Sequence, residues 1–167
     1  MAVRPLRYFG DPVLKSPSAP VTVFDDKLRS LVDDLMETVT LPGRAGLAAP
    51  QIGVGLRAFS YLVDGQHGYV INPEIVELST TEQDGPEGCL SVPGMNFPTR
   101  RAKFATVRGV DVDNEPVVVS GHGELARCLQ HETDHLDGML YIDRLPADQR
   151  KEAFRLARGS DWFWSAR

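Results

Sequence analysis

The segment Gln130–Gly138 reads QHETDHLDG and contains the pattern His-Glu-x-x-His. Residues four apart on a helix share a face, so His131 and His135 can turn ring nitrogens toward one metal ion. Glu132 can reach a water molecule in an open coordination position and act as a general base. The segment therefore predicts a catalytic metal helix around which the chain is organised. The alternative is a helix that carries two unrelated surface histidines.

The composition fits one globular domain. The chain has 167 residues, a net charge of −5, 42% hydrophobic residues and 25% charged residues, which are ordinary values. The negative charge argues against broad binding of nucleic acid or membranes. The sequence shows no apolar run long enough to cross a bilayer and no secretory h-region at its start. We therefore expect a single cytoplasmic domain over residues 1–167.

Hydrophobic periodicity predicts helices near both ends and strands between them. Apolar residues at helical spacing predict a helix over 25–39, with Asp25 as its N-cap. Segments rich in β-branched and aromatic residues predict strands over 56–63, 69–72, 74–79, 104–111 and 116–120. Consecutive strands without intervening helices favour an antiparallel sheet. The proline-rich segment 5–24 predicts an extended arm, not a helix. The metal helix is expected over 123–137, and a last helix between Pro146 and Gly159.

A catalytic metal site of this kind needs a third protein ligand and one open position. Cys128 lies seven residues from His135, about 10 Å along a helix axis, so we expect it to pack beneath the site. His122 is further away, and His67 lies in a turn expected to be exposed. Cys89 can approach from a separate segment as a thiolate and is preferred. A buried apolar role for a lone cysteine remains the alternative.

The segment Gly43–Gly53 combines glycines and small residues with one amide side chain, Gln51. Its glycines let the backbone approach another group closely, and Gln51 offers both a donor and an acceptor. A plain connector is equally compatible with this composition.

Three stretches together resemble the peptide deformylase family, namely Gly46–Gln51 (GLAAPQ), Glu87–Ser91 (EGCLS) and Gln130–His135 (QHETDH). Their order and spacing match the family from Gly10 to about Leu145. The resemblance implies an α+β fold in which antiparallel sheets pack around a central metal-binding helix, with an N-terminal and a C-terminal helix. It also implies hydrolytic removal of the N-formyl group from the initiator methionine of newly made polypeptides, with release of formate.

The same resemblance implies roles for individual residues. One divalent ion would be bound by Cys89, His131 and His135, with Fe²⁺ as the native metal and Zn²⁺, Ni²⁺ or Co²⁺ as possible substitutes in a purified sample. Glu132 would be catalytic. The other implied roles are oxyanion stabilisation by the Gln51 amide and the Leu90 backbone N–H, and peptide binding by the backbones of Gly46 and Gly88.

Two arginines depart from the family pattern. Arg44 stands where the family commonly has glycine, and Arg127 stands where related enzymes often place an apolar residue near the methionine pocket. We expect Arg127 to lay its stem along the pocket and keep its charged head in water.

The C-terminal segment 144–167 holds six basic residues against three acidic residues. A basic helix could contact ribosomal RNA phosphates, as some family members dock on the ribosome, or it could simply be solvated. The tail Trp162–Trp164 is expected to be packed down or frayed.

Parts of the sequence are also compatible with two other functions. A zinc metalloprotease shares the helix motif but would need a differently spaced third ligand, and a non-catalytic metal-binding module would not need Glu132 or Gln51.

Overall fold

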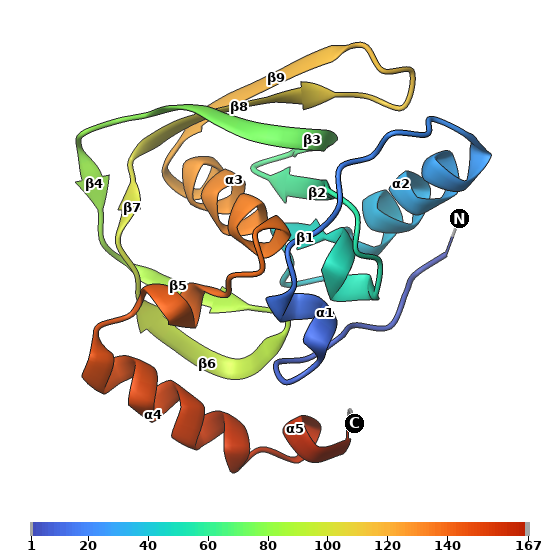
Figure 1. Ribbon diagram of the computed structural model, residues 1–167. Coiled ribbons are helices and arrows are strands. Elements are labelled where there is room, and N and C mark those ends of the chain that lie inside the picture. The colour runs from blue at the N-terminus through green and yellow to red at the C-terminus, as the bar shows by residue number, and fades with distance from the viewer. Residues whose placement is uncertain (1, 166–167) are drawn as a thin grey trace.

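Helix α3 (Gly123–Leu136) occupies the middle of the molecule in the computed structural model, which describes residues 2–165 (Figure 1). One sheet has the strand order β1-β2-β3-β8-β9, and two smaller sheets pair β4 with β7 and β5 with β6, all antiparallel. The strands are β1 (Gly46–Ala48), β2 (Ala58–Val63), β3 (Gln66–Leu78), β4 (Glu82–Gln83), β5 (Pro86–Cys89), β6 (Val92–Pro98), β7 (Arg101–Ala102), β8 (Phe104–Val110) and β9 (Pro116–His122). The expected α+β class is confirmed.

Helix α3 is buried on all sides, with every residue from Leu125 to Leu136 inaccessible or nearly so. Leu125, Leu129 and Leu136 turn toward the large sheet and pack with Phe59 and Val107 among others. The opposite face carries polar residues, including both histidines, and looks toward β5, β6 and the C-terminal helices (Figure 1). A helix held between two layers in this way has a fixed rotation about its axis, which fixes the direction of its polar side chains.

Helix α2 (Asp26–Thr38) begins where the sequence predicts it. The Asp25 carboxylate accepts the backbone N–H of Leu28 at 3.1 Å, which caps the first turn. The apolar stripe of α2 packs against Leu47, Ile52 and Ile71, so this helix supports β1 and the short 3₁₀ helix η1 (Ala49–Ile52) that follows it.

Two local predictions are wrong. Residues 5–24 are not wholly extended, because α1 (Pro12–Lys15) forms there, with the Asp11 side chain accepting the Val13 N–H at 3.1 Å. Proline suits the first turn of a helix, where its missing N–H costs nothing. The predicted strands 69–72 and 74–79 form one strand, β3, whose register shifts between Ile71 and Glu74. Asn72 takes a positive φ of 52° at this shift.

The C-terminal part closes the lower side of the molecule through the 3₁₀ helix η2 (Tyr141–Arg144), α4 (Ala147–Arg158) and α5 (Asp161–Ser165). Helix α4 buries Ala153 and Ala157 against the β6 side of the core. Within the aromatic tail, Phe163 is buried and its ring lies 5.8 Å from that of Phe9. Phe163 is therefore packed down, whereas Trp164 is 60% exposed.

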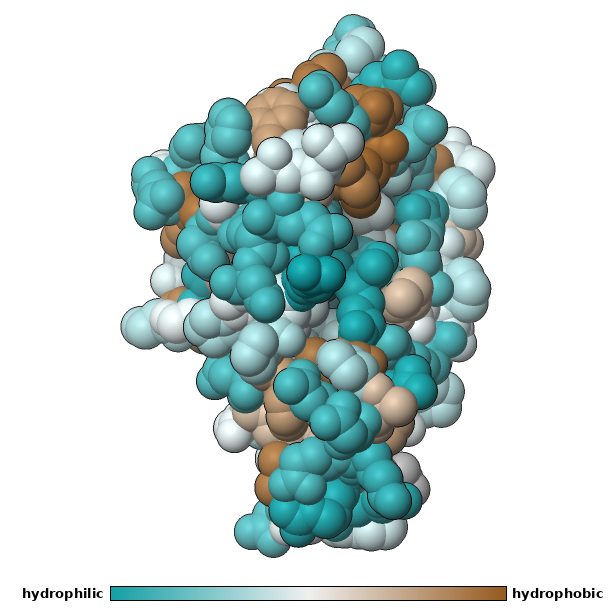
Figure 2. Space-filling view, turned by 90° about the vertical axis from the view of Figure 1, so that its left-hand side faces the viewer, coloured by the Kyte–Doolittle hydropathy of each residue, from teal (hydrophilic) through white to brown (hydrophobic). Residues whose placement is uncertain are grey.

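The surface beside β4 and α4 is mostly hydrophilic, with hydrophobic residues gathered near its top, where β3, β8 and β9 lie in Figure 1 (Figure 2). Among the helices described, none combines the length and the apolar character needed to cross a membrane.

Candidate metal centre

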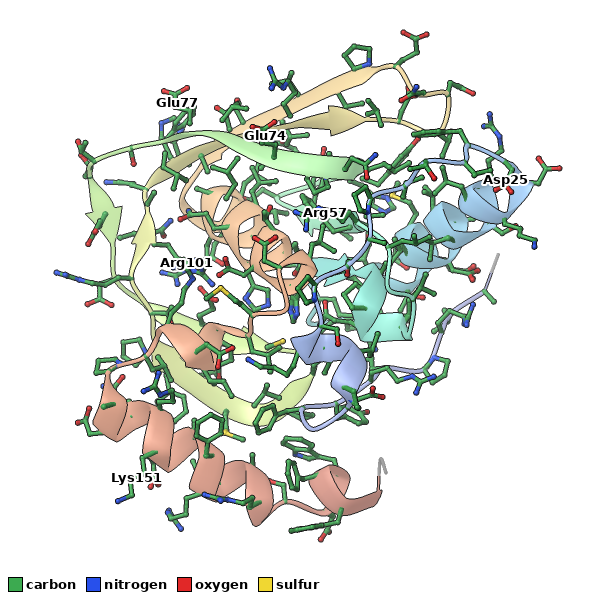
Figure 3. All side chains as sticks on the ribbon, viewed as in Figure 1. Asp25, Arg57, Glu74, Glu77, Arg101 and Lys151 are labelled. Atoms are coloured by element: carbon green, nitrogen blue, oxygen red, sulfur yellow. The ribbon has the colours of Figure 1, made fainter. Side chains whose placement is uncertain are left out.

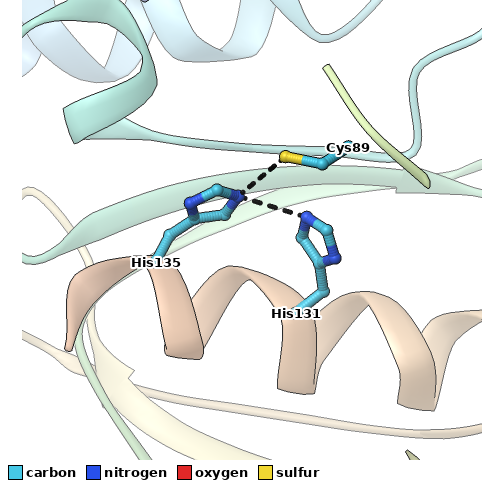
Figure 4. A group of neighbouring side chains, drawn as sticks. All are labelled: Cys89, His131 and His135. Carbon is cyan, nitrogen blue, oxygen red and sulfur yellow. Dashed lines mark hydrogen bonds between the residues drawn. The ribbon is translucent and has the colours of Figure 1, made fainter. Parts of the chain in front are cut away.

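Three side chains from two distant segments converge beside α3 (Figure 4). His131 and His135 lie one turn apart on α3, and their Nε2 atoms are 3.1 Å from each other. The Cys89 Sγ, at the end of β5, lies 3.4 Å from the His135 Nε2. All three potential ligand atoms lie within 4.8 Å of one another.

These separations fit a divalent metal ion. In a tetrahedral site with metal–nitrogen bonds of about 2.0–2.1 Å and a metal–sulfur bond of about 2.3 Å, neighbouring ligand atoms lie roughly 3.3–3.6 Å apart. The observed 3.1 Å and 3.4 Å are within a few tenths of an ångström of that range. The three residues leave a fourth position for water or substrate, which is the arrangement of catalytic sites.

Glu132 presents a carboxylate to the same space. Its side chain is buried, its Oε2 has no hydrogen-bond partner among residues 2–165, and its Oε1 lies 4.0 Å from the His131 Nε2. Burial is the main reason why the pKa of Glu132 rises to about 7. A buried carboxylate oxygen without a partner is costly, so this atom fits a water molecule bound beside the histidines.

Gln51 is held in place from both ends of its amide. Its Oε1 accepts the backbone N–H of Ala48 at 2.9 Å, and its Nε2 donates to the Ser91 hydroxyl at 3.1 Å and lies 3.7 Å from the Cys89 Sγ. Leu90, the residue after Cys89, lines the same cleft. The segment Gly43–Gly53 is thus more than a connector, since it forms β1 and η1 and carries Gln51 to the cysteine.

Two glycines allow the segments to come this close. A Cβ on Gly46 would lie 2.5 Å from the Glu132 Oε1 and 2.7 Å from the Cys128 Sγ. A Cβ on Gly88 would lie 2.7 Å from the Asn96 Oδ1. Real Cβ contacts are longer than this, so a side chain at Gly46 would displace the Glu132 carboxylate or Cys128, and one at Gly88 would require the Asn96 side chain to move.

A buried network of charges supports the histidines, and the sequence did not reveal it. The Glu87 carboxylate accepts the Nδ1–H of His131 at 2.8 Å and two hydrogen bonds from Arg101 at 2.9 Å and 2.6 Å. Arg101 also donates to Asp134 at 2.7 Å, and Asp134 binds Arg144 through both of its oxygens. Figure 3 shows Arg101 reaching from β7 toward α3.

This network holds Glu87 ionised. Burial alone would raise the pKa of the Glu87 carboxyl, but the hydrogen bonds from Arg101 and His131 outweigh it and hold the pKa far below its usual value. An ionised acceptor at Nδ1 fixes the orientation of the His131 ring and directs its Nε2 toward the metal position. The signal in the sequence was the acid two residues before Cys89.

The two arginines that depart from the family pattern have different surroundings. Arg44 is half-buried and donates to the Thr38 carbonyl oxygen at the end of α2, at 3.0 Å. Arg127 is 5% exposed, and its head donates to the Glu87 carboxylate and to the Thr99 carbonyl oxygen, each at 2.8 Å. The expectation that its head lies in water is therefore wrong, because a buried acid and a carbonyl replace the water.

The remaining ligand candidates lie elsewhere. Cys128 is buried on the sheet side of α3, with its Sγ 3.4 Å from the Ala45 carbonyl oxygen. His67 is exposed, and its Nε2 lies 3.1 Å from the Met36 carbonyl oxygen. His122 is exposed at the start of α3, beside the ring of Phe104.

The chain is similar to known proteins over most of its length. The family model for polypeptide deformylase matches residues 3–151. A peptide deformylase of Acidothermus cellulolyticus is 56% identical over 162 residues, which span 97% of this chain and 89% of that protein. The crystal structure of peptide deformylase from Thermus thermophilus is 36% identical, with a TM-score of 0.90 over 99% of this chain and 100% of that chain. That of a peptide deformylase from Legionella pneumophila is 40% identical, with a TM-score of 0.86 over 92% of each chain.

Proposed function

The chain belongs to the polypeptide deformylase family, and we propose that it removes the formyl group of N-formyl-methionyl polypeptides at the centre formed by Cys89, His131 and His135. The observation that supports this most directly is the unpartnered Glu132 oxygen beside these three potential ligands. A site built only for stability would have no use for such a group.

The three ligand side chains would hold one divalent ion, which when bound supplies a Lewis acid and water of lowered pKa. Glu132 lies where it can take a proton from the attacking water and pass it to the nitrogen of the departing amine. Bond breaking then releases formate and leaves a free amino terminus on the methionine. Glu87 orients the ring of His131 throughout.

We assign oxyanion stabilisation to the Gln51 amide and the Leu90 backbone N–H. Gln51 is fixed by Ala48 and Ser91, so its Nε2 does not have to reorganise as charge develops on the formyl oxygen. Replacing Gln51 with leucine should lower kcat by about 10²–10³-fold with little loss of metal.

The peptide backbone would pair with β1. This strand lies at the edge of the large sheet, with β2 as its neighbour, and an extended peptide can add to such an edge through main-chain hydrogen bonds. Gly46 on β1 and Gly88 on β5 would bind the peptide from both sides of the cleft. Binding through the main chain explains how varied sequences after the methionine are accepted.

The Glu132→Gln variant tests this mechanism. We expect it to retain full metal and the wild-type fold but to lose deformylation of formyl-Met peptides by at least about 10²-fold. The matched control is Glu115→Gln, at an exposed position in the β8–β9 turn, which should retain wild-type turnover. Normal turnover by the metal-loaded Glu132→Gln variant would overturn the role of Glu132, and cleavage of internal peptides instead of formyl-Met-Ala would favour a protease.

We propose Fe²⁺ as the metal bound in the cell. One thiolate and two imidazoles accept several divalent ions, including Zn²⁺, Ni²⁺ and Co²⁺, so the proposal rests on family membership. Anaerobic purification should yield about one iron per chain and activity that is lost in air. One zinc per chain with air-stable activity would overturn it.

We further propose that α4 docks on the ribosome, where the substrate emerges. Its buried face uses Ala153 and Ala157, while four basic side chains on it are exposed, and Lys151 points outward in Figure 3. These four residues are Arg150, Lys151, Arg155 and Arg158. Arg144 and Arg155 contribute less to this surface, because Asp134 binds Arg144 and Glu152 binds Arg155, each through both carboxylate oxygens.

Charge reversal tests docking better than truncation, because α4 belongs to the core. We expect the double change of Arg150 and Lys151 to glutamate to abolish salt-sensitive co-sedimentation with ribosomes and to preserve turnover of short peptides. Undiminished co-sedimentation would end the proposal. Docking on ribosomes would locate the protein in the cytoplasm. We propose that residues 1–167 form one catalytic domain.

A further inference from the structure

A cavity of about 440 Å³ extends from the metal ligands along α3 toward the start of that helix. Its walls include His131, Cys128, Arg127 and Glu124, which lie progressively nearer the start of α3, together with Ala45 and Met95. A formyl group is bonded to the nitrogen of the first residue, so a formyl carbon held at the ligands places the first side chain in this cavity. The inference below therefore rests on the proposed function.

The far end of the cavity has a polar wall in Arg127. Both hydrogen bonds of its guanidinium group within the described chain run from Nη1, to Glu87 and to Thr99. The Nε atom is buried and has no partner among residues 2–165. The Nη2 atom makes no hydrogen bond within the described chain, and a Cβ added at Gly85 would lie in van der Waals contact with it, at 3.6 Å.

A buried guanidinium N–H without an acceptor is costly, and a ligand atom that accepts from it recovers that cost. The thioether sulfur of methionine is a weak acceptor, and the oxygen of methionine sulfoxide is a strong one. The methylene group of norleucine, which has the shape of methionine, accepts nothing.

The surrounding charges favour a neutral acceptor. Arg127 is paired with Glu87, and the exposed carboxylate of Glu124 lies 3.9 Å from its Nε. Glu132 lines the same cavity nearer the ligands. A negatively charged substrate side chain would meet these carboxylates and be repelled.

We propose that Arg127 is a specificity-determining residue that recognises a neutral acceptor atom at the end of the substrate's first side chain. The chain would then deformylate peptides that begin with N-formyl-methionine sulfoxide as well as those that begin with N-formyl-methionine. Polypeptides whose first residue has been oxidised would remain substrates.

The test compares kcat/KM for formyl-Met, formyl-methionine sulfoxide and formyl-norleucine versions of one short peptide, measured by formate release with the metal-loaded enzyme. We expect the wild-type enzyme to process the sulfoxide within about threefold of methionine. In Arg127→Met the ratio of sulfoxide to methionine should fall by about 10-fold or more, as expected for loss of a hydrogen bond to a charged group. In the same variant, kcat/KM for the formyl-norleucine peptide should rise relative to that for the formyl-Met peptide.

Two more variants guard against misfolding. Gly85→Val should cover Nη2 and lower the same ratio, without touching the hydrogen bonds between Arg127 and Glu87. Arg100→Met removes an exposed arginine whose Nε lies 3.5 Å from Glu82, and it should leave the ratio unchanged.

An unchanged sulfoxide ratio in both Arg127→Met and Gly85→Val would overturn the inference, as would wild-type rejection of the sulfoxide by more than about 100-fold. Loss of turnover on all three peptides by the metal-loaded wild-type enzyme would instead overturn the proposed function, and the inference with it.

Discussion

Glu87 joins the metal centre to the charges behind it, because a single carboxylate accepts hydrogen bonds from Arg101, Arg127 and His131. Water cannot replace any of these partners if it is lost, because all four side chains are at least nine-tenths buried. Removing one member of a buried ion pair leaves the other charge without a partner, and this destabilises the fold by more than the intact pair stabilises it.

We therefore expect Glu87→Gln to lower the free energy of unfolding by about 3–5 kcal/mol and to weaken metal binding by about 10–100-fold. Urea denaturation and metal titration against a competing chelator measure the two effects. The control is Glu82→Gln, which alters an exposed pair with Arg100 and should change stability by about 0.5 kcal/mol or less. Equal effects of the two substitutions would refute the supporting role of Glu87.

Gly46→Ala should lower kcat on the order of 100-fold, because the new Cβ would displace the Glu132 carboxylate from the metal position. A formate-release assay on metal-loaded protein provides the measurement. Gly55→Ala is the matched control, since nothing lies within 4 Å of the Cβ it would add. Wild-type turnover by Gly46→Ala would mean that Glu132 does not need its present position.

The two cysteines should differ in how they respond to metal removal. Cys89 is half-buried at the cleft and would be released by a chelator, whereas Cys128 is buried and burial raises the pKa of its thiol well above the usual value. Timed alkylation with iodoacetamide and mass spectrometry should show modification of Cys89 only after chelation, with Cys128 unmodified in the folded protein. Equal labelling of Cys89 with and without metal would argue against its ligation.

The elements differ in how well the sequence predicts them. Helices α2 and α3 follow a long periodic pattern with caps that can be recognised, at Asp25 and Gly138, so their bounds were predicted within one or two residues. Strand β1 and the β5–β6 hairpin were missed, since short glycine-rich strands show no alternation. Arg101 and Asp134 look like surface charges in the sequence, because only tertiary packing buries them.

The prediction of separate strands around Pro73 failed for a physical reason. Proline disrupts a ladder, but the chain keeps β3 continuous by shifting register there. The side chain of Asn72 accepts the N–H of Val21 at 2.8 Å and donates to its carbonyl oxygen at 2.9 Å. These two bonds tie the N-terminal arm to the sheet, and no local pattern announces them.

Helix α5 buries Phe163 in the cluster beside β6 and α4. Phe163→Ala should lower the free energy of unfolding by about 3 kcal/mol, the usual cost for a buried phenylalanine. Trp164→Ala, at a position that is 60% exposed, should cost about 0.5 kcal/mol or less. Urea denaturation of both variants at equal metal loading compares them, and similar losses would mean that the tail is not packed as described.

At the scale of the whole molecule, α3 lies between two layers with separate apolar clusters, one toward the large sheet and one toward β6 and α4. Cys89 comes from the second layer and Gln51 from the first, so the metal centre forms only when both layers are packed on the helix. Its geometry is thus a property of the entire fold. The polar cavity wall at Arg127 belongs to the same arrangement, because Thr99 and Glu87 hold it from the second layer.

Strand β1 spans only three residues. A peptide that paired with so short an edge would be bound only over its first few residues, and the residues after them would extend into solvent. Under the proposed pairing, a pentapeptide and a polypeptide of several hundred residues would offer this strand the same contacts, and a protein could lose its formyl group while the rest of it is still being made.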